Sequence, residues 1–151
     1  MRVRACLALM SAGTVGVSAL DAQQPHAAPT DSAQLQGTWT MVSGNAGGMA
    51  LSPDLVSSMR RVASGNEVTI TMSGQLYFKA LIVLNPAASP RTIDYHMTGG
   101  PTAGATQLGI YELKGDTVRF CFGAPNAPRP VDFTATSGNQ RTLSTWVRAR
   151  P

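Results

Sequence analysis

The sequence predicts an all-β protein, a small antiparallel barrel of eight strands with one short helix after the first strand. From Leu35 onward, short runs rich in Val, Ile, Thr and aromatic residues alternate with turn residues. Most runs also alternate apolar and polar side chains, as Val68, Ile70 and Met72 do with their polar neighbours, which is typical of a sheet with one face on a core. About eight such runs in roughly 115 residues match a closed barrel, which leaves no exposed sheet edge.

The boundaries of the expected strands follow from turn residues. Residues 73–75 and 114–116 are short connections that contain glycine and suit hairpins. Residues 85–90 and 124–130 contain prolines, which cannot continue a ladder of hydrogen bonds. We expect strands at 38–43, 67–73, 76–84, 91–98, 106–113, 117–122, 131–135 and 142–148.

One helix of two to three turns is expected to begin at Pro53. Ser52 is a suitable N-cap, proline fits the first helical position, and Asp54 favours the positive end of the helix dipole. Apolar residues then recur at helical spacing at Leu55, Val56, Met59 and Val62. So short a helix is not stable alone, and we expect it to pack across one end of the barrel.

Residues 1–22 have the pattern of a secretory signal peptide. Arg2 and Arg4 precede an uncharged stretch of apolar and small residues, and Ala19 or Ala22 offers a cleavage site. The stretch is shorter than the roughly 20 apolar residues of a membrane span, so no stable membrane insertion is expected after cleavage. We therefore expect a secreted or periplasmic protein, with residues 23–34 as a disordered linker and 35–151 as the barrel domain.

Removal of residues 1–22 changes the charge and the cysteine count. The chain loses two arginines and one aspartate, so its formal charge falls from +4 to +3. It keeps one cysteine, Cys121, and so has no intramolecular disulfide. The remaining sequence has one adjacent basic pair, Arg60–Arg61, and no stripe of aromatic residues for stacking, so a nucleic acid is not an expected partner.

The segment Leu-Gln-Gly-Thr-Trp at 35–39 resembles the start of a lipocalin-type barrel. The resemblance implies that Gly37 opens the first strand, that Trp39 closes the base of the barrel, and that Arg148 or Arg150 covers the tryptophan. Together with the segments at 53–60, 109–113, 115–121 and 129–133, it makes the chain resemble an uncharacterised family of secreted bacterial lipocalin-like domains of planctomycete type. That resemblance implies a fold and an exported location, and no catalytic residue.

An eight-stranded barrel is either filled by side chains or just wide enough for one small ligand. The leading hypothesis is a non-enzymatic protein that binds a small, mostly apolar molecule inside the barrel. The expected lining residues are Ile70, Phe78, Ile93, Tyr95, Ile110 and Phe120. The alternative is a filled barrel that acts as an interaction or inhibitor module through its glycine-rich segments 44–50 and 99–105, with a protein partner that the sequence does not identify.

Few residues offer catalytic or metal-binding chemistry. Asp94 and His96 lie on the same face of one expected strand and either form an acid–base pair or simply face solvent. Cys121 is either a reactive thiol or a small packed side chain. Tyr111 and Glu112 must point to opposite faces, and the sequence leaves open which one faces inward. No catalytic residue, cofactor or metal site is expected, because no known catalytic motif or set of metal ligands is present.

Overall fold

The computed structural model describes residues 27–151, and the expected signal peptide lies outside this range. Strands dominate, and most connections between them are short. The elements are α1 (Asp31–Gln34), β1 (Gly37–Ala46), β2 (Met49–Ala50), α2 (Pro53–Ser58), β3 (Met59–Ser64), β4 (Glu67–Met72), β5 (Gln75–Asn85), β6 (Arg91–Gly99), β7 (Thr106–Lys114), β8 (Thr117–Phe122) and β9 (Thr142–Arg148).

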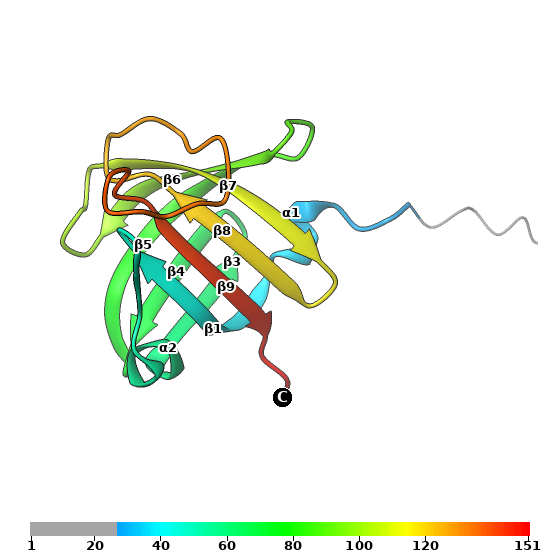
Figure 1. Cartoon of the computed structure of the whole chain (residues 1–151). Coiled ribbons are helices and arrows are strands. Elements are labelled where there is room, and N and C mark those ends of the chain that lie inside the picture. The colour runs from blue at the N-terminus through cyan, green and yellow to red at the C-terminus, as the bar shows by residue number, and fades with distance from the viewer. Residues whose placement is uncertain (1–26) are drawn as a thin grey trace, which may run out of the picture.

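Eight of the strands form a closed antiparallel barrel, as the sequence predicts (Figure 1). Each strand from β3 to β8 pairs with the next, β1 pairs with β3, and pairing of β1 with β9 closes the circle. The two-residue strand β2 pairs with β1 alone and lies outside the barrel, so the segment 44–50 is a hairpin. The fold class is confirmed.

The antiparallel order gives the barrel two distinct ends. The starts of β1, β4, β6 and β8 meet the ends of β3, β5, β7 and β9 at one end, which we call the base, and α1 packs there (Figure 1). The opposite end, which we call the mouth, carries α2 and the turn at 100–105. The hydroxyl of Ser52 accepts a hydrogen bond from the amide of Leu55, and α2 ends at Ser58.

The strand β3 was not expected, because its residues extend the helical spacing of α2. Met59, Arg61 and Ala63 point into the barrel, while Arg60, Val62 and Ser64 point out. The sequence here does not alternate apolar and polar residues, so the strand follows from pairing with β1 and β4 and not from a local pattern. The helix therefore stops earlier than its apolar spacing suggests.

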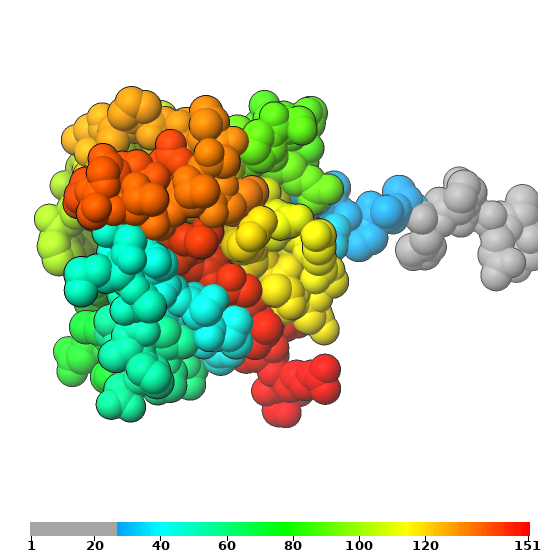
Figure 2. Space-filling view, viewed as in Figure 1, coloured from blue at the N-terminus to red at the C-terminus, as the bar shows by residue number. Residues whose placement is uncertain are grey.

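The strand expected at 131–135 is absent, and this prediction is wrong. β8 pairs directly with β9, so the barrel has no free edge at which this segment could pair. The connection at 123–141 instead lies along the outside of the barrel, where its orange atoms form a continuous cover (Figure 2). Arg129 anchors it with hydrogen bonds to Asp94 (2.6 Å) and to the carbonyl of Gly109 (2.8 Å).

The end of the expected linker 23–34 belongs to the folded domain. Thr30 caps α1, and Asp31 accepts hydrogen bonds from the Tyr111 hydroxyl (2.7 Å) and from Arg91 (3.0 Å). These polar contacts carried no signal in the local sequence. Within residues 27–151, no helix combines the length and apolar character that crossing a bilayer requires.

Candidate functional site

The barrel contains a cavity of about 290 Å³ that reaches from the mouth to the middle of the strands. Residues from α2, from the turn at 100–105 and from the barrel strands surround it. Tyr77 and Met72 are 45% and 37% exposed, and they lie where the cavity meets solvent. The lining residues are Met41, Ala46, Leu51, Leu55, Met59, Arg61, Ile70, Met72, Tyr77, Phe78, Tyr95, Met97, Pro101, Thr102, Gln107, Phe120, Phe122, Thr142, Ser144 and Trp146.

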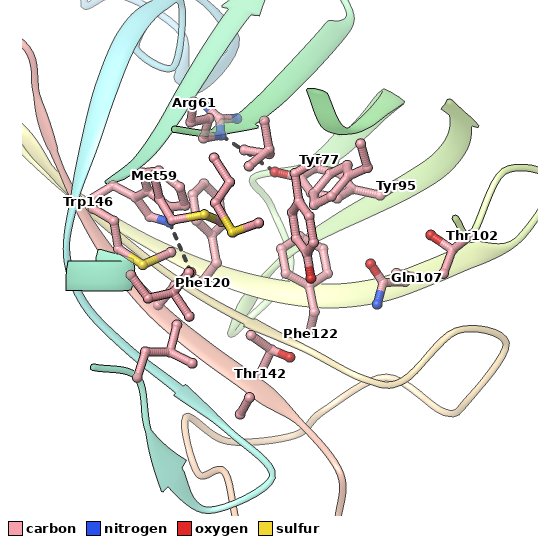
Figure 3. A pocket seen from close by; sticks show the side chains of 18 of the residues that line it. Met59, Arg61, Tyr77, Tyr95, Thr102, Gln107, Phe120, Phe122, Thr142 and Trp146 are labelled. Atoms are coloured by element: carbon pink, nitrogen blue, oxygen red, sulfur yellow. Dashed lines mark hydrogen bonds between the residues drawn. The ribbon is translucent and has the colours of Figure 1, made fainter. Parts of the chain in front are cut away.

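The wall is mainly apolar and includes four methionines, at 41, 59, 72 and 97. Aromatic rings cover much of the rest, and Figure 3 shows Tyr77, Tyr95, Phe120, Phe122 and Trp146 around the space. Methionine side chains are flexible and polarizable, so they adapt to ligands of different shape. The wall suits a small apolar molecule.

One charged side chain, Arg61, borders the inner part of the cavity. It is 0% exposed, and its Cζ lies 5.1 Å from the centroid of the Phe120 ring. Its Nη1 donates to the carbonyl of Leu35 (3.3 Å), and its Nε lies 3.5 Å from the hydroxyl of Tyr95, a contact marked in Figure 3. Its Nη2 has no hydrogen-bond partner within the described range.

The acidic residues of the described chain are engaged elsewhere. Each except Asp54 forms an ion pair with a basic residue other than Arg61, and Asp54 is exposed in the first turn of α2. The paired residues are Asp31, Glu67, Asp94, Glu112, Asp116 and Asp132. Arg61 is therefore a buried positive charge with no carboxylate bound to it in residues 27–151.

Four of the six residues expected to line the interior do so: Ile70, Phe78, Tyr95 and Phe120. Ile93 is buried in the core but does not border the cavity, because it lies in the half of the barrel nearer the base.

The prediction for Ile110 is wrong, because this residue faces the outside of the barrel. It pairs with Cys121, whereas the next pair, Tyr111 with Phe120, faces inward. The connection at 123–141 covers this outer surface, since the thiol of Cys121 contacts the carbonyl of Thr134 (3.8 Å). Burial on both faces of β7 and β8 explains why an outward residue looks like a core residue in the sequence.

The base of the barrel is closed by Trp39 and Arg148. The Trp39 side chain is fully buried, its Nε1 donates to the carbonyl of Leu35 (3.1 Å), and the Arg148 guanidinium lies 4.4 Å from its ring centroid. Arg148 also donates to the carbonyls of Gln34 and Gln36. Gly37 has a φ of +92°, so a side chain there would be strained beside Arg148.

Asp94 and His96 do not form a catalytic pair in this structure. Asp94 pairs with Arg129 at 2.6 Å, whereas the Nδ1 of His96, an exposed residue, contacts the hydroxyl of Thr106 at 3.1 Å. The two side chains have different partners, so neither orients the other.

Tyr111, and not Glu112, faces inward. Tyr111 is 1% exposed, and burial together with the Asp31 carboxylate raises the pKa of its hydroxyl above the ordinary range. Glu112 lies outside, where hydrogen bonding by Lys114 lowers the pKa of its carboxyl, and it also pairs with Arg119 (2.8 Å). Burial raises the pKa of the Cys121 thiol, which disfavours the reactive thiolate.

Sequence reasoning missed Arg61 and the methionines as lining residues. Arg61 was part of the expected helix. Its side chain reaches the cavity because residue 61 lies on β3 and points into the barrel. No local signal could have found Arg61, because residues 59–64 do not alternate apolar and polar side chains in the sequence. In residues 27–151, no three His, Cys, Asp or Glu side chains are grouped as metal ligands would be.

Comparison of the chain with protein-family models, with curated proteins and with solved structures gives no match in any of the three.

Proposed function

We propose that the protein is an exported, non-enzymatic barrel that binds one small, mostly apolar molecule in the cavity at its mouth. The observation that carries this proposal is the cavity of about 290 Å³ with its apolar wall. Sites for small molecules are concave and apolar, with a few polar groups that orient the ligand. The cavity has this composition, with the polar groups of Arg61, Tyr95 and Ser144 set among methionines and aromatic rings.

The volume gives the size of the ligand. Liquid water occupies about 30 Å³ per molecule, so the space holds roughly ten water-sized groups. A chain of eight carbons with one polar head has this size, and a longer chain would extend through the mouth. The alternative of a filled interaction barrel needs side chains to occupy this volume, so the cavity favours the binding hypothesis.

The export part of the proposal rests on the signal-peptide pattern of residues 1–22. The resemblance of residues 35–148 to secreted lipocalin-like domains also supports it. A binding protein outside the cytoplasm meets small molecules from the environment. Sequencing the N-terminus of the natural protein tests export, because cleavage would leave a chain that begins at Leu20 or Gln23.

The cavity is tested with 1-octanol as an uncharged probe in isothermal titration calorimetry. Leu55 lines the cavity from α2, and Leu55→Trp places a larger side chain in the space that the probe needs. We expect this variant to bind 1-octanol at least about tenfold more weakly than the unaltered chain, because ligand and indole compete for one volume.

Val83→Trp is the matched control. Val83 is 52% exposed on β5 and does not border the cavity, so the same indole there should leave 1-octanol binding unchanged. Equal binding by both variants, or no binding by the unaltered chain, would contradict the proposed function.

A further inference from the structure

Arg61 is a buried charge whose interactions do not account for its burial. An arginine side chain stays protonated in proteins, and burial of an unpaired charge is costly. Its partners in residues 27–151 are one carbonyl, one hydroxyl at 3.5 Å and one aromatic ring, and all of them are neutral. No negative charge among the described residues therefore compensates this arginine.

A purely structural role does not explain the side chain. Arg61 Nη1 donates to the carbonyl of Leu35, but that carbonyl already accepts a hydrogen bond from Trp39 Nε1 at 3.1 Å. Without the arginine, the carbonyl of Leu35 would keep its hydrogen bond from Trp39. A methionine of similar length would fill the same volume without the cost of a buried charge.

Two donor groups belong to residues that border the cavity. Arg61 Nη2 is buried and has no partner among the described residues, and Arg61 borders the cavity. The hydroxyl oxygen of Tyr95 accepts from Arg61 Nε at 3.5 Å, so the hydrogen of this hydroxyl is free to be donated. Tyr95 borders the cavity as well. A carboxylate accepts from both groups, because it has two oxygens.

Resting on the proposed function, we propose that the natural ligand is an amphipathic monoanion, with a carboxylate at Arg61 and Tyr95 and an apolar tail toward the mouth. One arginine without a second cation suits a single negative charge. Met59 and Met97 would pack along the tail, and Met72, at the mouth, would contact its far end.

The test compares octanoate with 1-octanol, two probes with the same number of carbons and different head groups, by isothermal titration calorimetry at pH 7.5. We expect octanoate to bind the unaltered chain about 10- to 100-fold more tightly, as hydrogen bonds to a charged group imply. Acetate has the charge without the tail and should bind at least about tenfold more weakly than octanoate.

Arg61→Met should remove the preference, so that octanoate and 1-octanol bind this variant within about threefold of each other. Arg60→Met is the matched control, because Arg60 is the neighbouring residue on β3 and its side chain is exposed on the outer face. This control should keep the preference. Arg61→Met should also melt no earlier than the unaltered chain, since it loses an uncompensated buried charge.

The outcomes separate this inference from the proposed function. Binding of 1-octanol with no preference for octanoate would overturn the inference and leave the proposed function standing, and this comparison needs no variant. If neither octanoate nor 1-octanol binds the unaltered chain, both proposals are overturned. The inference is also overturned if acetate binds as tightly as octanoate, or if Arg60→Met loses the preference to the same extent as Arg61→Met.

Discussion

Trp39→Ala is expected to lower the free energy of unfolding by about 3–5 kcal/mol. The side chain is fully buried at the base of the barrel, and its removal leaves a void beneath Arg148 and takes one donor from the carbonyl of Leu35. A domain of this size is stable by about 5–15 kcal/mol in total, so the loss is a large share of the stability. Urea denaturation followed by circular dichroism measures it.

Tyr77→Ala is the control for this experiment, because Tyr77 is an aromatic residue that is 45% exposed at the mouth. Its truncation should cost less than about 1 kcal/mol, as exposed positions usually do. A similarly small cost for Trp39→Ala would contradict the conclusion that Trp39 closes the base.

Phe120→Ala is expected to cost about 3 kcal/mol, near the lower end of the range for phenylalanine truncations. Phe120 is 1% exposed and packs against Tyr111, Phe122 and Arg61. It also borders the existing cavity, so one side of the ring has fewer contacts to lose than a fully packed ring has. Urea denaturation compares this variant with the unaltered chain.

Phe133→Ala is the matched control on the outer surface. The Phe133 ring lies 4.2 Å from the Arg119 guanidinium, and loss of this contact should cost only about 1 kcal/mol. If Phe133→Ala cost as much as Phe120→Ala, the ring of Phe120 would not be a main support of the barrel interior.

The fold could be predicted because most strands carry a clear alternation and are separated by clear turns. In β8, Val118, Phe120 and Phe122 point inward as their spacing predicts. The strand count of eight was correct, but one expected strand does not exist and β3 replaces it. Local sequence cannot decide such cases, because a short run without the alternation of a strand still takes its form from the strands beside it.

The candidate site was less predictable than the fold. Ile70, Phe78, Tyr95 and Phe120 could be found from alternation, which gives the inward face. Arg61 could not, because charged residues are normally expected on the solvent face of a strand. The depth of a residue along the barrel axis, which separates Ile93 from the cavity wall, depends on register and is not encoded in a local pattern.

The most direct test of the binding cavity is an NMR titration of methionine methyl groups with 1-octanol. Met41, Met59, Met72 and Met97 line the cavity, whereas Met49 is 76% exposed on β2 outside the barrel. We expect the four cavity signals to shift together along one saturable curve while the Met49 signal stays in place. Cavity signals that remain unmoved up to the solubility limit of 1-octanol, or a shift confined to Met49, would contradict it.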